Sequence, residues 1–205
     1  MSNPTGLRER KKARTRDAIS EAAISLFLAH GFDGVSVADI AAAAEISKPT
    51  LFRYFPAKED LVLHRIADHA GESARVVRER PDGTSPLNAL HAHQRDGLDR
   101  RDPVTGLNDH PQVLAFYRLM ITTPSLVARM AQYQFDNENA LTEALGGDTP
   151  ARLRAAGFLA SHRVLAETNW RKLTAGRGAD EVYPEALADV DLAFELLRHG
   201  SGDPA

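Results

Sequence analysis

The sequence predicts an all-α protein of about nine helices, in which a three-helix N-terminal domain with a helix-turn-helix precedes a C-terminal helical bundle. Apolar residues recur at spacings of three and four along the chain, and the alternation typical of strands is nowhere sustained. The chain has 205 residues, 43% of them hydrophobic, which is enough to bury one sizeable core or two small ones. Capping residues and first-turn prolines mark where many of the helices start.

The first helix is expected over residues 15–29, with Gly31 at the position of a C-terminal cap. Its apolar positions follow the helical repeat and share one face, which predicts a buried side. These positions are Ile19, Ala22, Ala23, Leu26 and Phe27.

The second helix begins after Ser36, because Ser36 and Asp39 have the spacing of a capping pair. The helix ends in a turn at Glu45 and Ile46. Its inward positions, at spacings of three, four and seven, are Val37, Ile40, Ala41 and Ala44.

The third helix is short, capped by Ser47 and ending near Phe55-Pro56. Pro49 fits its first turn, where amide hydrogens have no partner within the helix. Leu51 and Phe55 lie four residues apart and are expected to point inward. They form a small core with Ile40 and Ile46 that holds the second and third helices together.

The remaining helices are expected over residues 58–80, 111–121, 151–175 and 185–199, and three hydroxyl–proline pairs mark the start of the 151–175 helix and of two further helices. These pairs are Ser85-Pro86, Thr123-Pro124 and Thr149-Pro150. The loop 176–178 separates the last two helices. The polar segments 100–103 and 108–110 are interpreted as disordered loops.

Charge is distributed unevenly although the net charge is only −3. Residues 8–16 contain six cations against Glu9 alone, and the chain beyond residue 60 is mildly acidic. The six cations are Arg8, Arg10, Lys11, Lys12, Arg14 and Arg16. A basic arm on an acidic body suits a phosphate-rich partner, and a solvated basic tail is the alternative.

The outward face of the third helix has side chains suited to a DNA major groove, which is about 12 Å wide. Lys48 and Arg53 can donate to phosphates or to guanine, and Phe52 can contact a thymine methyl group. Thr50 and Tyr54 have hydroxyls that can donate to phosphates. Alternatively, the two helices are an ordinary part of a bundle with a solvated polar face.

The segment GFDGVSVADIAAAAEISKPTLFRYFPAKEDLV, residues 31–62, resembles the DNA-binding domain of the TetR family of bacterial regulators. The resemblance covers about residues 12–62. It implies an all-helical homodimer with an N-terminal DNA-binding domain and a C-terminal ligand-binding and dimerising domain. It also implies that double-stranded operator DNA and a small-molecule effector are the partners, and that the effector releases the protein from its operator.

The resemblance implies DNA contacts at positions that match the family pattern. Ser36 is placed near a phosphate, and Lys58 lies beside the phosphate backbone although a cation is unfavourable at a helix start. Arg14, in the basic arm, is added as a phosphate contact. The other implied contacts are Lys48, Thr50, Phe52, Arg53 and Tyr54.

Two positions depart from the family pattern. Position 52 is usually tyrosine, so Phe52 lacks a hydroxyl and the phosphate hydrogen bond that it would make. Position 45 is commonly glycine, so Glu45 costs about 1 kcal/mol of stability if its φ is positive.

The expected domain boundaries follow from this organisation. Residues 1–14 are the basic arm and residues 15–57 the helix-turn-helix domain. Residues 58–200 are the ligand-binding and dimerising domain, and residues 201–205 a disordered tail.

Candidate ligand-binding residues of the C-terminal half are aromatic, methionine or histidine side chains at helical positions, where a core role is the alternative. They are Phe116, Tyr117, Met120, Tyr133, His162 and Trp170. The apolar stripe of the last helix packs either internally or on a second subunit, and is expected to form the dimer interface. The stripe consists of Leu187, Val190, Phe194 and Leu197.

The sequence indicates no metal site, cofactor or catalytic centre. The chain contains no cysteine, and His91 and His93 are two residues apart, which points them to different sides of a helix. No apolar run is long enough for a membrane span, so a cytoplasmic protein is expected. The favoured function is a repressor of a palindromic operator, not an enzyme. A helical enzyme or small-molecule carrier and a transcriptional activator are the alternatives.

Overall fold

The computed structural model describes residues 4–199, with the backbone alone described for residues 4–9, 67 and 68. The expected tail, residues 201–205, and the first three residues of the expected arm lie outside this range. Within it the chain forms ten α-helices, two 3-10 helices and no strand, which confirms the all-α prediction. The helices are α1 (Pro4–His30), α2 (Val37–Ala43), α3 (Lys48–Tyr54), α4 (Lys58–Leu63), η1 (His64–His69), α5 (Glu72–Arg78), α6 (Pro86–Asp99), η2 (Pro103–Thr105), α7 (Pro111–Thr122), α8 (Pro124–Ala144), α9 (Thr149–Thr174) and α10 (Ala179–His199).

The described chain divides into two compact units. The N-terminal unit contains the residues up to His69 together with Ala115–Met130, and the C-terminal unit contains Ala70–Leu114 and the residues from Ala131 onward. Helices α7 and α8 therefore each contribute residues to both units. The N-terminal unit is larger than the 15–57 segment, because it includes α4, η1 and parts of these two helices.

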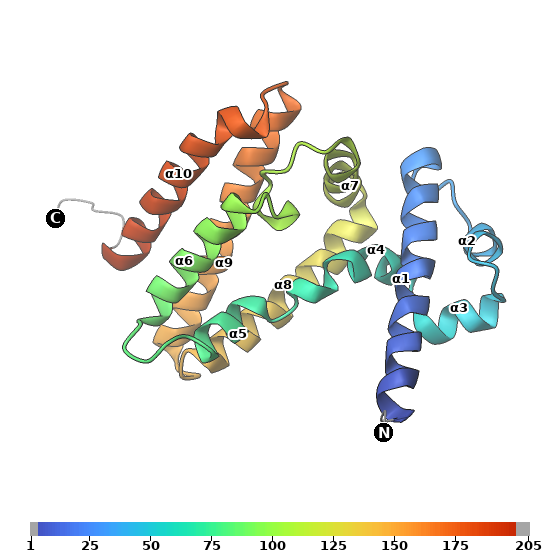
Figure 1. Cartoon of the computed structure of the whole chain (residues 1–205), viewed down its shortest axis with the longest axis horizontal. Coiled ribbons are helices and arrows are strands. Elements are labelled where there is room, and N and C mark those ends of the chain that lie inside the picture. Colours follow the sequence, from blue (N-terminus) through green and yellow to red (C-terminus); the bar gives the residue numbers. More distant parts are fainter. Residues whose placement is uncertain (1–3, 200–205) are drawn as a thin grey trace. The chain divides into compact units, whose positions relative to one another are not determined.

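The N-terminal unit is built on α1, against which α2 and α4 pack, while α3 packs on α2 (Figure 1). Its core joins apolar side chains of these helices to residues of α7 and α8. Its fully buried members include Ile19, Phe27, Ile40, Leu51, Leu61, Val62 and Leu126. In the C-terminal unit α10 packs on α6 and α9, and α5 packs on α6. No helix among the described residues has the length and apolar character that crossing a bilayer requires.

Two predicted helix boundaries were wrong in the first half of the chain. Helix α1 begins at Pro4, not near residue 15, so the described part of the basic arm is helical. Arginine, lysine and alanine in this stretch are good helix formers, which lets the helix continue. The single helix expected over 58–80 is interrupted by η1 and by Gly71, whose φ of +66° belongs to the left-handed region.

Two helix starts in the second half also differ from the prediction. The cap of α9 is Asp148, whose Oδ1 accepts a hydrogen bond from the Ala151 amide at 2.8 Å, and Thr149 is already helical. Helix α10 begins at Ala179 and has Pro184 within it. The carboxylate of Asp109 accepts from the Ala179 amide at 2.9 Å and stabilises this earlier start. The pair Ser85-Pro86 does begin α6, as predicted.

The polar loop expected to be disordered has a defined structure. Arg101 has a φ of +54°, and the Asn108 side-chain amide donates to its carbonyl at 2.8 Å. The Arg101 guanidinium also lies 4.4 Å from the centre of the Tyr183 ring. These contacts and the 3-10 helix η2 replace the expected disorder.

Candidate nucleic-acid interface

Helix α2 begins with the predicted capping pair. The Asp39 amide donates to Ser36 Oγ at 3.2 Å, and the Ser36 amide donates to Asp39 Oδ2 at 2.8 Å. Ser36 Oγ also donates to Asp39 Oδ2 at 2.6 Å, and these bonds lower the pKa of Asp39. The hydroxyl proton of Ser36 is therefore already directed at a carboxylate. A direct phosphate contact by this side chain requires that bond to be exchanged.

The turn between α2 and α3 is closed by backbone hydrogen bonds. The Ile46 amide donates to the Ala41 carbonyl at 2.9 Å, and the Glu45 amide donates to the Ala42 carbonyl at 3.1 Å. Glu45 has a φ of +53°, which fulfils the condition attached to its predicted cost. An L-residue in this conformation is destabilised by about 1 kcal/mol relative to glycine.

Helix α3 is fixed at both ends and along one face. Ser47 accepts from the Thr50 amide at 3.3 Å, and Pro49 occupies the first turn, as predicted. Leu51 and Phe55 have 1% and 2% of their surface exposed, so the predicted inward pair is confirmed. Phe55 ends the helix in an extended conformation, and the residue before a proline is disfavoured in the α region.

Helix α3 has four exposed side chains: Lys48, Pro49, Phe52 and Arg53. Half of the Phe52 surface is exposed, at 49%, so its aromatic ring is available for contact. Thr50 is partly buried, and its Oγ1 lies 2.9 Å from Ser47 Oγ. Helix α3 therefore brings two cations and an aromatic ring to one surface, as a groove-binding helix requires.

Tyr54 and Lys58 are engaged within the unit. Tyr54 is partly buried against the core, and the Arg53 guanidinium lies 5.7 Å from its ring centre. The Lys58 ammonium donates to the Phe32 carbonyl and lies 4.3 Å from the Phe32 ring centre. In the free protein Lys58 has these internal partners, and its contact with a phosphate backbone stays a prediction. The aromatic ring and the carbonyl, rather than a phosphate, compensate the cation at the start of α4.

The basic residues of α1 form two groups. The side chains of Arg10, Lys11, Lys12 and Arg14 are exposed. The guanidinium of Arg16 is partly buried and donates from Nη2 to the Tyr54 carbonyl at 3.0 Å. Sequence reasoning treated these cations as equivalent, because a contact between residues 38 positions apart leaves no local signal.

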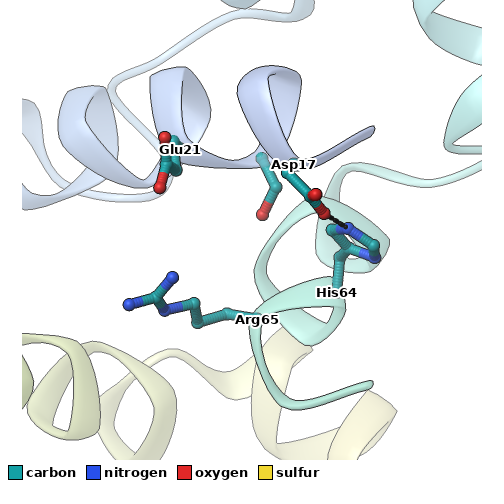
Figure 2. Close-up of a pocket in the computed structure, with 5 residues that line it drawn as sticks. Asp17, Glu21, His64 and Arg65 are labelled. Carbon is teal, nitrogen blue, oxygen red and sulfur yellow. Dashed lines mark hydrogen bonds and ion pairs between the residues drawn. The ribbon is translucent and has the colours of Figure 1, made fainter. Parts of the chain in front are cut away.

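A cavity of about 300 Å³ lies in the N-terminal unit and is shown in Figure 2. It is lined by Asp17, Ser20, Glu21, His64 and Arg65. Asp17 Oδ1 lies 2.9 Å from His64 Nε2, and Ser20 Oγ donates to the Leu61 carbonyl at 2.7 Å. Two carboxylates make this cavity unsuited to a phosphate. Its polar bonds attach α1 to α4 and η1.

The candidate ligand-binding residues are divided between the two units. Met120 is buried in the core of the N-terminal unit and Phe116 packs against that core, which favours the alternative of a core role for these two residues. Tyr117, on α7, is partly buried and belongs to the same unit.

Tyr133, His162 and Trp170 belong to the C-terminal unit and are partly buried. Burial raises the pKa of Tyr133 above its ordinary value. His162 Nδ1 lies 2.8 Å from Oε1 of the buried Gln94, and its ring stacks on Phe158. This polar pair on α6 and α9 was missed, because a glutamine within a helix gives no sign of its burial.

The candidate dimer residues lie on the inner face of α10. Val190 and Phe194 have 0% and 2% of their surface exposed, and Leu187 and Leu197 pack against the same core. The prediction that this stripe forms the dimer interface is therefore corrected, because one chain alone buries it. The outer apolar residues of the last two helices are Leu153 and Val164 on α9, and Leu192 and Leu196 on α10.

Comparisons with known proteins agree with this arrangement. Residues 19–65 match the family model described as bacterial regulatory proteins, tetR family. The chain is 32% identical, over 205 aligned positions, to the HTH-type transcriptional regulator TcmR of Streptomyces glaucescens, and the match covers 91% of each protein. The chain belongs to the TetR family of bacterial transcriptional regulators. The similarity of this TetR-family regulator to its relatives is therefore not confined to the helix-turn-helix, because the match to TcmR covers 91% of the chain.

Other known proteins are similar to this chain over part of its sequence or in fold alone. The HTH-type transcriptional repressor LfrR of Mycolicibacterium smegmatis is 33% identical over 117 residues, which are 56% of this chain and 60% of LfrR. NalD of Pseudomonas aeruginosa has a similar fold, with a TM-score of 0.60 at 17% identity over 88% of this chain and 96% of NalD. FadR of Bacillus subtilis, solved with stearoyl-CoA, has a TM-score of 0.54 at 17% identity over 89% of this chain and 97% of FadR.

Proposed function

We propose that this TetR-family protein is a repressor that binds a palindromic operator as a homodimer and is released by a small-molecule effector. The observation that carries the proposal is the division of α3 into two faces. Leu51 is buried in the core while Lys48, Phe52 and Arg53 are exposed. A short helix fixed in this way can place its free face in a major groove.

The proposed DNA contacts fall into two classes. Lys48 and Arg53 donate to guanine or phosphate, and Phe52 contacts a thymine methyl group. Thr50 and the Tyr54 hydroxyl donate to phosphates, as does Arg14 on the exposed side of α1. Ser36 and Lys58 join them only if they exchange their internal partners, Asp39 and the Phe32 carbonyl, for phosphate oxygens.

The proposed dimer is made by α9 and α10. Leu192 and Leu196, one turn apart on α10, are 55% and 47% exposed, and Val164 on α9 is 50% exposed. Exposed apolar residues on adjacent helices suit a second copy of the same surface. A two-fold dimer would place its two α3 helices in successive major grooves, about 34 to 36 Å apart.

The proposed effector is a small molecule with substantial apolar surface. LfrR is a repressor, NalD is the secondary repressor of the MexAB-OprM multidrug efflux pump, and FadR was solved with stearoyl-CoA. Tyr133, His162 and Trp170 remain the proposed ligand-binding residues of this chain, and His162 with Gln94 supplies a polar anchor. A regulator of bacterial operators would work in the cytoplasm, where the DNA is.

The proposal is tested by selecting duplexes from a random-sequence pool with the wild-type protein. We expect enrichment of a palindromic sequence, and loss of its retention in the variant with Lys48→Ala and Arg53→Ala. Both replaced side chains are exposed, so the variant should keep the helical circular-dichroism spectrum of the wild type. Absence of any enriched duplex, or equal retention by the folded variant, would refute the proposed DNA-binding face. Release of the enriched duplex by compounds from a metabolite library then tests the effector.

A further inference from the structure

Arg16 connects α1 to the C-terminal end of α3. Its Nη2 atom donates to the Tyr54 carbonyl at 3.0 Å, and its guanidinium carbon lies 5.6 Å from the centre of the Phe55 ring. Arg14, one half-turn earlier on α1, is exposed, whereas Arg16 is partly buried. The side chain at position 16 thus faces the helix-turn-helix instead of solvent.

The end of α3 has a particular need for such a donor. The last carbonyls of a helix have no partner within it, and a cation there is also favoured by the helix dipole. Phe55 is extended and Pro56 has no amide hydrogen, so the chain leaving α3 supplies little in place of the missing bonds. Arg16 provides both a hydrogen-bond donor and a positive charge at the Tyr54 carbonyl.

Helix α3 is too short to hold its own orientation. Its seven residues span about 10 Å, and helices of this length are not stable by themselves in water. The face that bears Lys48, Phe52 and Arg53 is therefore positioned by contacts with other elements. Leu51 and Phe55 supply the apolar contacts, and Arg16 is a polar tie at the C-terminal end.

The neighbours of Arg16 on α1 make similar ties to other elements. Asp17 pairs with His64 of η1 at 2.9 Å, and Ser20 donates to the Leu61 carbonyl of α4 at 2.7 Å. One turn of α1 therefore attaches the ends of three short helical segments by side-chain hydrogen bonds. Arg16 and Ser20 are the buried or partly buried members of this group, and Asp17 is exposed.

We infer that Arg16 is a positioning residue, which sets the orientation of α3 for base recognition and does not contact the DNA backbone. This inference rests on the proposed DNA-binding function. Base contacts depend on the orientation of α3, whereas phosphate contacts by exposed cations of α1 do not. Loss of Arg16 should reduce discrimination between DNA sequences, and loss of Arg14 should weaken binding to all sequences alike.

The binding test uses the duplex that the wild-type protein enriches and a scrambled duplex of the same composition. Fluorescence anisotropy over a series of salt concentrations gives both affinities and their salt dependence. Arg16→Ala should lower affinity for the enriched duplex about tenfold, with little change for the scrambled duplex and an unchanged salt slope. Arg16→Lys keeps a cation and a donor, and should recover part of the lost discrimination.

The matched control is Arg14→Ala, which removes the same charge from the same helix. It should lower both affinities and reduce the magnitude of the salt slope by about 1.8, because each subunit of the dimer loses one phosphate contact. If Arg16→Ala gives this same pattern, Arg16 contacts a phosphate and the inference is wrong. The inference would also be wrong if Arg16→Ala had the same ratio of affinities for the enriched and scrambled duplexes as the wild-type protein.

A second measurement needs no DNA and separates failure of the inference from failure of the proposed function. Hydrogen exchange of the free protein should be faster in Arg16→Ala at the Phe55 amide, which donates to the Leu51 carbonyl at 2.9 Å. Exchange in α2 should be unchanged, and Arg14→Ala should resemble the wild type throughout. Equally faster hydrogen exchange at all amides of the N-terminal unit would show a general loss of stability. That result would contradict a positioning role for Arg16. A local change without any DNA binding would refute the proposed function alone.

Discussion

The carboxylate of Asp60 joins the first turn of α4 to the guanidinium of Arg129 on α8. Asp60 Oδ1 accepts from Arg129 Nη2 at 2.8 Å and from Nε at 3.0 Å, while Oδ2 accepts from the Ala57 amide at 3.1 Å. One side chain thus caps a helix and forms an ion pair with another. The two contributions can be separated by removing one partner at a time.

Asp60→Ala should lower the free energy of unfolding by about 2 kcal/mol, because both the cap and the ion pair are lost. Arg129→Ala should cost less than about 1 kcal/mol, since it removes only a partly exposed ion pair. Urea unfolding followed by circular dichroism measures both, with Glu59→Gln as the control for a charge change in the same turn. Equal losses in the two variants would show that the cap contributes nothing.

Replacing Glu45 by glycine should stabilise the protein. The φ of +53° at this position is strained for glutamate and ordinary for glycine, so Glu45→Gly should gain about 1 kcal/mol in the free energy of unfolding. Glu21→Gly, at an exposed position inside α1, should lose about 1 kcal/mol. Urea unfolding of both variants should therefore show shifts of opposite sign. A loss of stability in both would refute the argument from backbone strain.

Phe52→Tyr should strengthen binding to the enriched duplex. The ring is 49% exposed, so a hydroxyl can be added without disturbing the core, and a new phosphate hydrogen bond is worth about a two- to tenfold gain in affinity. Anisotropy titration measures the gain, and Phe52→Leu serves as a control without a hydroxyl. Unchanged affinity in Phe52→Tyr would indicate that the side chain at position 52 does not reach a phosphate.

Leu192→Glu and Leu196→Glu should convert the proposed dimer to monomers. Each substitution puts a charge on the exposed side of α10, where burial against a second copy would be costly. Light scattering coupled to gel filtration gives the mass of each variant. Phe135→Glu, at a 49% exposed position on α8, is the control and should remain dimeric. Dimeric Leu192→Glu and Leu196→Glu would exclude this face of α10 from the interface.

Glu185 should make stability depend on pH in the acid range. Hydrogen bonds from Arg177 at 2.6 Å and from Lys172 lower the pKa of Glu185 from 4.5 to about 2. A carboxyl with a depressed pKa in the folded state stabilises the protein above its unfolded pKa. That stabilisation is lost as the pH falls from about 4.5 towards about 2.

The variant Glu185→Gln should therefore lose stability near neutral pH and show a weaker decline between pH 4.5 and 2. Melting temperatures measured across this range test the expectation. Glu195→Gln, on the exposed side of the same helix, should keep the wild-type profile. A wild-type profile in Glu185→Gln would contradict the role of the ion pair.

Local signals explain why the helix-turn-helix could be predicted from the sequence. Ser36, Ser47 and Pro49 act on residues within one turn, so their spacing alone predicts where α2 and α3 begin. The inward pair Leu51 and Phe55 follows from helical periodicity in the same way. The positive φ of Glu45 was foreseen because family members commonly have glycine at that position.

Long-range contacts explain what could not be predicted. From the sequence, Lys58 and Arg16 were both expected to be available for DNA phosphates. In the structure each donates to a backbone carbonyl distant in sequence, Lys58 to Phe32 and Arg16 to Tyr54. Periodicity identified the apolar stripe of α10 that includes Val190 and Phe194. It could not show that α6 and α9 cover this stripe within one chain.

The start of α1 at Pro4 changes what its basic segment can do. A flexible basic tail would lose conformational entropy on meeting a duplex and could adapt to many spacings between charge and base contacts. Arg10 and Arg14 instead lie one turn apart on α1. The same helix carries Arg16, which donates a hydrogen bond to the Tyr54 carbonyl of α3. Their distance from the base-contacting face is therefore fixed before binding. The protein should therefore be sensitive to operators whose duplex geometry changes the position of the contacted phosphates relative to the recognised bases.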